Sequence, residues 1–326
     1  MTTGSLITDK IVVAESFNHF FTNIATQLVS KLPPHSGTYG PDHIQAHYTS
    51  LGAQQNSFSL KTVNNEDVLK QLVALQPNKA TGLDSIPTRF LRDAATSIAP
   101  IITHITNQSI SQCHVPQELK MARVIPLYKK GSNLDVGNYR PVSILSSTSK
   151  VIERLVHNQI ISFLKERNLL FEFQSGFRTS HSTDTCLLYL NDYIKREVDS
   201  GKVCGMAMLD LQKAFDTVNH SVLLQKLKAI GFDSTSLGWM KSYLEGREQV
   251  VDINGSMSSP LTVNCGVPQG SILGPLLFLL YINDMNAALI AVLPSPTRIP
   301  LTVAITGHFL SLMLKLRFLP GCWPLD

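Results

Sequence analysis

One aspartate of this chain stands where it could bind a cation. Asp210 lies near the end of the short apolar run 203–211, which is too brief for a typical helix and indicates a strand. Carboxylate oxygens are ligands that Mg²⁺ prefers, and two Mg²⁺ ions about 4 Å apart can hold the attacking and leaving oxygens of a nucleotidyl transfer. Taken alone, Asp210 fits an aspartate that caps the following turn better than it fits a metal ligand.

Two features downstream of Asp210 could touch a substrate. Phe215 stands five positions on, and by itself it fits an ordinary core phenylalanine equally well. Asp216, next to it, is interpreted as a carboxylate of a helix start or turn and not as a second ligand. Residues 266–271 read Gly-Val-Pro-Gln-Gly-Ser, in which glycine and proline fix a turn that lets the backbone approach a substrate closely. Gln269 in that turn offers both a donor and an acceptor.

The elements that must position these residues follow from the spacing of apolar and turn-forming side chains. Residues 151–166 carry apolar side chains at helical period and predict a core helix, and residues 222–230 predict another that ends at Gly231. Residues 122–128 are rich in β-forming residues, and the polar segment 129–133 is typical of a hairpin connection.

The N-terminal part and the segment before Gln269 are read in the same way. Phenylalanines at helical spacing predict a helix over residues 11–31, which Pro33-Pro34 stop, and a polar loop to about Ser57. Glu66-Asp67 open a short amphipathic helix. Residues 82–103 predict a turn and a helix, and residues 250–263 predict two strands joined by 254–256.

Composition places few limits on the partner. The chain has 326 residues, of which 44% are hydrophobic, and its formal net charge of +4 permits a polyanionic partner without requiring one. Five cysteines without the spacing of a zinc site or a disulfide framework favour a reducing compartment, so we expect an intracellular protein, in nucleus or cytoplasm. No signal peptide is visible, and the apolar run 272–282 is shorter than the roughly twenty residues of a bilayer span, so no membrane partner is expected.

The motifs taken together resemble one family. The string Leu-Asp-Leu-Gln-Lys-Ala-Phe-Asp at 209–216 and the string Cys-Gly-Val-Pro-Gln-Gly-Ser-Ile-Leu-Gly-Pro-Leu-Leu-Phe at 265–278 resemble motifs A and B of reverse transcriptases, specifically those of non-LTR (LINE-type, jockey/CR1-like) retrotransposons. Other blocks in the family's order are residues 14–21, 78–87, 125–131 with 138–145, and 173–178 with 181–183. The resemblance runs from about residue 11 to about residue 286.

The resemblance implies an α+β fold of the right-hand polymerase type, with fingers and a partial palm but no thumb. It divides the chain into a linker region over residues 1–60, a reverse transcriptase domain over 61–286 with 203–211 as a central palm strand, and a non-homologous tail over 287–326. The tail contains several prolines, so we expect it to pack poorly and interpret it as a shifted reading frame.

The implied activity is RNA-directed DNA polymerisation, with an RNA template, a DNA primer and deoxynucleotides as partners and two Mg²⁺ ions as cofactors. Asp210 would be the catalytic metal ligand, and Phe215 would pack under the incoming sugar and exclude a 2′-hydroxyl. The other implied nucleotide-binding residues are Lys129, Lys130, Arg140, Gln269 and Gly270, and the implied template-binding residues are Gln174, Phe177 and Arg178. Alternatively, the two lysines belong to a hairpin that is merely solvated, and Arg178 forms a structural salt bridge instead of contacting the template.

The chain departs from the family pattern in one respect. The family's next motif is a hairpin with adjacent aspartates that supply the remaining metal ligands, and this sequence contains no Asp-Asp pair. Asp284 follows the motif B helix too closely to return to the strand of Asp210. The alternative interpretation is therefore a catalytically inactive fragment that retains at most nucleic-acid binding.

Overall fold

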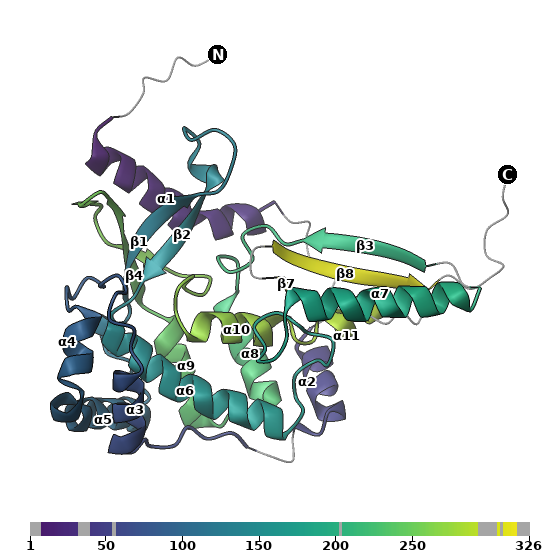
Figure 1. The fold of residues 1–326 in the computed structure, drawn as a ribbon, viewed down its shortest axis with the longest axis horizontal. Coiled ribbons are helices and arrows are strands. Elements are labelled where there is room, and N and C mark those ends of the chain that lie inside the picture. The colour runs from purple at the N-terminus through teal and green to yellow at the C-terminus, as the bar shows by residue number, and fades with distance from the viewer. Residues whose placement is uncertain are drawn as a thin grey trace.

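The computed structural model describes residues 8–31, 40–53, 57–201, 204–292, 305–306 and 309–317. These residues form both helices and strands, and several helices or strands often follow one another along the chain, which confirms the predicted α+β class (Figure 1). Most helices lie below one sheet in Figure 1, and a second, smaller sheet lies to one side.

The larger sheet holds the predicted hairpin. β1 (Met121–Tyr128) pairs antiparallel with β2 (Tyr139–Ile144), with Tyr128 opposite Tyr139. β1 also pairs in parallel with β4 (Arg247–Ile253), which in turn pairs with β5 (Ser256–Met257) and β6 (Leu261–Val263). The strands expected within 122–128 and 250–263 are confirmed.

Helix α1 (Lys10–Val29) lies against this sheet, as its phenylalanines predict. The Asp9 carboxylate accepts the N–H groups of Ile11 and Val12 at the start of the helix. Phe17 and Phe21 face inward and form a core cluster with the sheet residues Val124 and Val251. The helix therefore covers the sheet that carries the hairpin.

The polar loop expected before Ser57 is wrong in part, because α2 (Pro41–Ser50) forms there. Gly40 is its N-cap, and proline at its first position is preset for a helix because its missing N–H would be unsatisfied there anyway. Only Ile44 and Tyr48 of this helix are buried, so its polar composition conceals the short apolar side that packs on α8.

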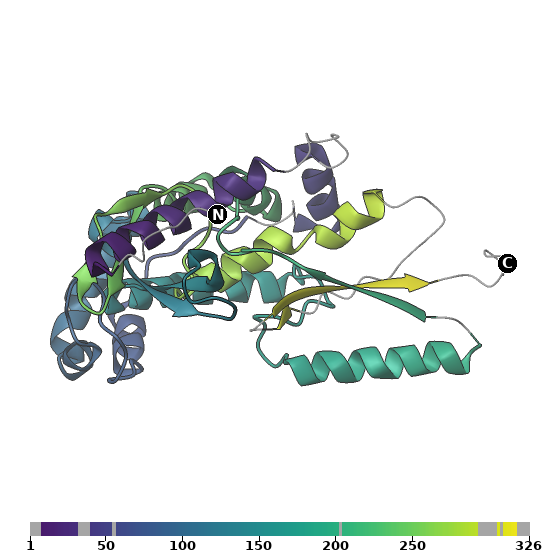
Figure 2. The ribbon, with the colours of Figure 1, turned by 90° about the horizontal axis from the view of Figure 1, so that it is seen from above.

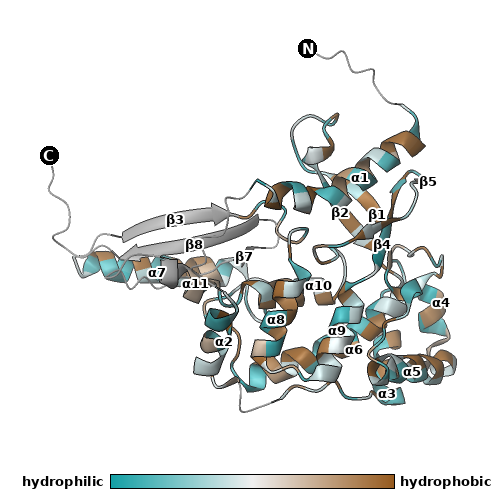
Figure 3. Ribbon diagram, turned by 180° about the vertical axis from the view of Figure 1, so that it is seen from behind, coloured by the Kyte–Doolittle hydropathy of each residue, from teal (hydrophilic) through white to brown (hydrophobic). Residues whose placement is uncertain are grey.

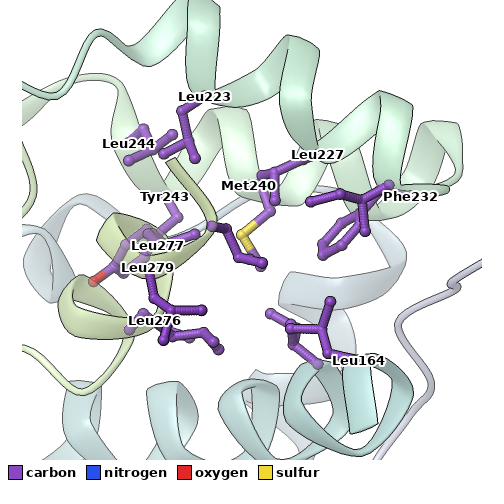
Figure 4. Close-up of a cluster of buried hydrophobic side chains, with 14 of the residues drawn as sticks. Leu164, Leu223, Leu227, Phe232, Met240, Tyr243, Leu244, Leu276, Leu277 and Leu279 are labelled. Atoms are coloured by element: carbon purple, nitrogen blue, oxygen red, sulfur yellow. The ribbon is translucent and has the colours of Figure 1, made fainter. Parts of the chain in front are cut away.

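The main core is a layer of helices below the sheet. It contains α6 (Ser147–Glu166), α8 (His220–Ile230), α9 (Ser234–Leu244) and α10 (Leu273–Ile282). Leucines from all four helices meet in one buried cluster (Figure 4). The helices predicted over 151–166 and 222–230 are confirmed, and Gly231 ends α8 with a φ of 115°. Hydrophobic and hydrophilic positions alternate around α8 in Figure 3, as expected for a helix that buries one side.

Helix α10 is apolar on every side and lies inside this core. Leu273, Leu277, Leu279 and Leu280 have no exposed surface. Its first N–H groups, those of Ile272 and Leu273, donate to the buried carboxylate of Glu153 on α6 at 2.6 and 3.4 Å. Among the described residues no helix is both long and apolar enough to cross a bilayer.

A helical group precedes the hairpin. It consists of α3 (Asn65–Val73), α4 (Thr88–Asp93) and α5 (Ala95–Ser111), which share a core with α6. The helix expected from Glu66-Asp67 and the helix expected within 82–103 are both confirmed.

The smaller sheet contains the strand of Asp210. β3 (Cys204–Asp210) pairs antiparallel with β8 (Phe309–Arg317), with Asp210 opposite Ser311, and β8 also pairs with β7 (Ile305–Thr306). The strand is confirmed, but its predicted central position is wrong within the described residues, because β3 is an edge of this sheet.

The tail contributes to this sheet. The tail 287–326 was expected to pack poorly. Within it, β8 forms a ladder over the length of β3, but the side chains of β8 lie outside the described part, so the expectation about packing stays a prediction. Alternating side chains and unpaired strand N–H and C=O groups favour such pairing whatever the origin of the sequence. α11 (Met285–Val292) also extends past residue 286. In Figures 1 and 2, α7 (Thr183–Asp199) and the β3–β8 pair project together from the rest of the molecule.

Candidate nucleic-acid and nucleotide site

The hairpin brings the predicted basic residues to one end of the large sheet. Lys129 follows β1 directly, and its N–H donates to the carbonyl oxygen of Asn138 at 2.9 Å. Arg140 is opposite Leu127 in the ladder and is half-buried. Lys129 and Lys130 are exposed. The hairpin therefore presents three cations at its connected end, where a polyanion can approach them.

Lys213 joins these cations although it is not among the residues predicted from the sequence. Its Nζ donates to the carbonyl oxygen of Tyr139 at 3.0 Å. Burial lowers the pKa of Lys213, the nearby Asp216 opposes that shift, and the charges of Lys129 and Arg140 lower the pKa further. Such mutual repulsion is relieved when an anion binds among the cations. The one sequence signal for Lys213 is its place three residues after Asp210.

The turn after β3 and the loop 264–271 are joined through their backbones. The N–H of Val267 donates to the carbonyl of Phe215 at 2.9 Å, and the N–H of Gly266 donates to that of Val218 at 2.8 Å. Gly266 has a φ of 87°, and a Cβ atom there would lie 2.8 Å from the carbonyl oxygens of Phe215 and Asp216. Only glycine permits this approach, so the two motifs form one unit.

The same loop is fixed to β2 on its other side. The N–H of Ser143 donates to the carbonyl oxygen of Gln269 at 2.7 Å. Gly270 follows with a φ of 132°, and a Cβ atom on it would collide with the carbonyl oxygen of Ser143. The predicted tight turn is confirmed, and the backbone that it approaches in this structure is that of β2.

Gln269 is half-buried and bonds to Asp216. Its Nε2 donates to Oδ1 of Asp216 at 2.8 Å. Burial raises the pKa of Asp216 to about 6, against the opposing effects of the Gln269 hydrogen bond and of Lys213. Asp216 lies in the turn, as predicted, whereas the cap of the following helix is Asn219, whose side chain accepts the N–H of Val222. The contact between Asp216 and Gln269 could not be read from the sequence.

Phe215 lies between the core and an exposed aromatic ring. Its ring stacks on Phe278 with centroids 4.8 Å apart, and it meets the edge of Phe177 at 5.8 Å. Phe177 is 43% exposed and has a φ of 58°. Phe215 thus has the packing of a core residue on one side, and its contact with an incoming sugar stays a prediction.

The other two predicted template residues hold their own loop together. Gln174 is 2% exposed, and its Nε2 donates to the carbonyl oxygen of Gly176 at 3.3 Å. Nη1 of Arg178 donates to the carbonyls of Phe171, Glu172 and Gln174 at 2.9 to 3.2 Å. These bonds arrange the loop around Phe177, and template contact by Gln174, Phe177 and Arg178 stays a prediction.

Asp210 ends β3, and its side chain lies outside the described part of the structure, so its role as a metal ligand stays a prediction. Its partner across the ladder is Ser311, not an acidic residue. Asp284 is fully buried and forms an ion pair with Lys226, whose Nζ also donates to the carbonyl of Tyr281 at 2.6 Å. Asp284 thus bonds to a residue of α8, a contact that the sequence did not indicate.

The described side chains, which do not include that of Asp210, form no site for two Mg²⁺ ions. Oδ1 of Asp216 bonds to Gln269, and Asp284 forms an ion pair with Lys226. Among the described residues, no group of three or more acidic, histidine or cysteine side chains gathers where it could hold a metal ion.

Comparison with known proteins gives a consistent picture. A family model described as reverse transcriptase (RNA-dependent DNA polymerase) matches residues 127–297. The chain is 34% identical, over 71% of its length, to the probable RNA-directed DNA polymerase from transposon BS of Drosophila melanogaster. It is also 36% identical, over 67% of its length, to the probable RNA-directed DNA polymerase from transposon X-element of the same species. The RNA-directed DNA polymerase from mobile element jockey of Drosophila funebris is 34% identical over 68% of the chain. The chain spans 24 to 26% of the length of these relatives.

Proposed function

This chain belongs to the reverse transcriptase family, and from that membership we propose that it binds an RNA template with its DNA primer and an incoming deoxynucleotide. The β1–β2 hairpin acts as part of the fingers, and β3 with the turn after it acts as part of the palm. The nucleotide lies between Lys129, Lys130 and Arg140 on one side and Phe215, Gln269 and Gly270 on the other.

The observation that carries the proposal is the connection of three separate motifs at one place. The loop of Gln269 bonds to β2 through Ser143 and to the turn of Phe215 through Val267, while Lys213 of that turn bonds to the hairpin at Tyr139. Residues that are more than a hundred positions apart thus surround one region rich in cations. Guanidinium and ammonium groups suit a triphosphate and a nucleic-acid backbone.

A second candidate function, nucleic-acid binding without nucleotide addition, is favoured by the placement of the carboxylates. Polymerases of this family use divalent metal ions, which would supply charge for the transferring phosphoryl group. Asp210 would need further acidic partners, yet Ser311 stands opposite it and Asp216 and Asp284 have other partners. We propose that this chain binds its substrates and does not extend a primer.

The test is binding of the full chain to a labelled RNA template annealed to a DNA primer, measured by fluorescence anisotropy. Arg140→Ala should weaken binding at least several-fold, whereas Arg89→Ala, which removes an exposed arginine from α4, should not. Equal losses in both variants, or none in either, would reject the assigned surface. In parallel, Mg²⁺ and deoxynucleotides should produce no extended primer. Extension that disappears in Asp210→Asn would reject the second candidate.

A further inference from the structure

The side-chain amide of Gln269 forms a hydrogen bond through only one of its two ends among the described residues. Nε2 donates to Asp216, and Oε1 has no donor among the described residues. The backbone around it is held by the bonds of Ser143 and Val267 described above, which keep Gln269 next to the turn of Asp216. The end that it presents to a ligand therefore depends on which end Asp216 holds.

An ionised carboxylate can only accept hydrogen bonds, so it must hold the NH₂ end of the Gln269 amide and leave the oxygen for another donor. A protonated carboxyl group can also donate, so it permits the amide to turn over and present NH₂ instead. The charge of Asp216 therefore decides whether Gln269 offers an acceptor or a donor.

We propose that Asp216 is a positioning residue that holds Gln269 with its carbonyl oxygen toward the bound nucleotide, so that Gln269 accepts a hydrogen bond from the base pair or sugar. This inference rests on the proposed function, because it assumes that Gln269 touches the nucleotide. It adds a residue that does not itself meet the substrate.

The surroundings of Asp216 raise the pKa of its carboxyl group toward neutral pH. Oδ2 is buried without a partner among the described residues, and burial raises the pKa of the group to about 6. The orientation of Gln269 is therefore set to change within the range of pH in which the protein can be studied. Lys213 favours the ionised form, and the thiol of Cys265 on the facing loop has its pKa raised by burial and by Asp216.

A cavity of about 50 Å³ lies beside Asp216 and Gln269, both of which line it. Arg247 and Glu248 of β4 line it together with Asp216, and Nη2 of Arg247 is also buried without a partner among the described residues. A space of this size can hold water, and a water molecule there would donate to Oδ2 and leave Oδ1 for Gln269.

One further titratable group faces this unit. His220 on α8 lies 2.7 Å from the carbonyl oxygen of Gly266 through Nε2, and burial lowers its pKa. A measurement against pH must distinguish the titration of His220 from that of Asp216. The variants His220→Gln and Asp216→Asn each remove one of the two groups.

The first measurement follows the side-chain amide of Gln269 in the ¹⁵N-labelled full chain from pH 5 to pH 8, with Gln269→Ala to identify its signals. We expect a shift with a midpoint near pH 6 in the wild-type chain and in His220→Gln, and none in Asp216→Asn. A midpoint that persists in Asp216→Asn and disappears in His220→Gln would overturn the proposal.

The second measurement is the affinity for a fluorescent deoxynucleoside triphosphate that matches the template, with a primer ended by a dideoxynucleotide. The ratio of wild-type to variant affinity cancels the titration of the nucleotide itself. We expect Asp216→Asn to bind about fivefold more weakly than wild type at pH 8, as for one lost hydrogen bond, and equally at pH 5. A constant ratio at all pH values would overturn the proposal while leaving the proposed function intact.

A second variant distinguishes a loss of the Asp216–Gln269 bond from misfolding. Gln269→Glu places a like charge beside Asp216, so nucleotide affinity should fall at pH 8 and recover at pH 5, where the two groups can share a proton. Weak binding that does not recover would count against the proposal. If the wild-type chain binds no nucleotide although the amide shift is present, the proposed function fails, and with it the role of Gln269 toward the nucleotide, while the Asp216–Gln269 contact stands.

Discussion

Gly270 lies so close to Ser143 that a Cβ atom on it would overlap the carbonyl oxygen of Ser143. This contact joins the loop of Gln269 to β2, and hence to the hairpin that carries Lys129 and Arg140. The geometry of the candidate site depends on the absence of a side chain at this one position.

Gly270→Ala should separate the loop from β2. We expect a loss of about 1–3 kcal/mol in the free energy of unfolding, because the added methyl group forces the backbones apart, and at least tenfold weaker primer–template binding. Urea denaturation and anisotropy measure the two effects.

Gly255→Ala is the matched control for Gly270→Ala. Gly255 also has a positive φ, 89°, but no atom lies within 4 Å of its potential Cβ. Gly255→Ala should lower the free energy of unfolding by about 1 kcal/mol through backbone strain alone and leave primer–template binding unchanged. Equal effects of the two substitutions on binding would contradict the role of the Gly270 contact.

Glu153→Ala should destabilise the start of α10. The buried carboxylate accepts the N–H of Ile272 and the hydroxyl of Tyr243, and it lies near the charge of Arg247. Burial raises the pKa of this carboxyl group, so we base the expected loss on its hydrogen bonds. Its removal leaves the start of the helix and the hydroxyl of Tyr243 without their acceptor, for which we expect a loss of about 1–3 kcal/mol. Thermal and urea unfolding followed by circular dichroism test this. Glu153→Gln retains an acceptor and should lose less; the reverse order would contradict the capping role.

Lys226→Met should destabilise the chain by about 3–5 kcal/mol, because it removes a buried ion pair and leaves the negative charge of Asp284 in the core. The double substitution with Asp284→Leu removes both charges and should recover most of the loss. The exposed pair of Lys241 and Glu245 on α9 is the control, and Lys241→Ala should change stability little. A double variant as unstable as the single one would show that packing, not charge, is responsible.

Because of Asp216, the stability of the chain should decrease as the pH rises. Its pKa in the folded chain is about 6, above the ordinary value of 3.8, so the folded state binds the proton more tightly than the unfolded state. The contribution of this group to stability is complete below pH 3.8 and is lost as the pH rises through 6. Relative to Asp216→Asn, the free energy of unfolding of the wild-type chain should therefore fall by up to about 3 kcal/mol between pH 4 and pH 7. A difference between the two proteins that is independent of pH would show that Asp216 is ionised normally.

Binding of primer–template should weaken with salt because Lys129, Lys130, Arg140 and Lys213 displace counterions. Four phosphate contacts predict a loss on the order of 100-fold between 50 and 200 mM salt. Lys213→Ala should reduce the slope of log affinity against log salt by about 0.9, and Lys241→Ala should not. An unchanged slope in Lys213→Ala would remove that residue from the interface.

Local sequence determined the elements and the family. Periodicity alone predicted α6 and α8 because their apolar side chains recur at helical spacing, and Gly231 marked the end of α8 because it adopts a positive φ. The hairpin of β1 and β2 followed from β-forming residues around a polar connection. Two motifs, at 209–216 and 265–278, were sufficient to indicate the reverse transcriptase family that the comparison then established.

Tertiary structure decided how these pieces meet. Helix α2 was not predicted because only two of its residues are buried, which is too few to produce a helical pattern of apolar side chains. The pairing of β3 with β8 joins residues a hundred positions apart, and the alternation of side chains in a strand does not reveal which distant strand will pair with it. The bond from Gln269 to Asp216 and that from Lys213 to Tyr139 likewise link distant segments. Residue types and spacing report what each segment can form, whereas distances between segments arise only when the core of α6, α8, α9 and α10 packs and fixes the loops around it.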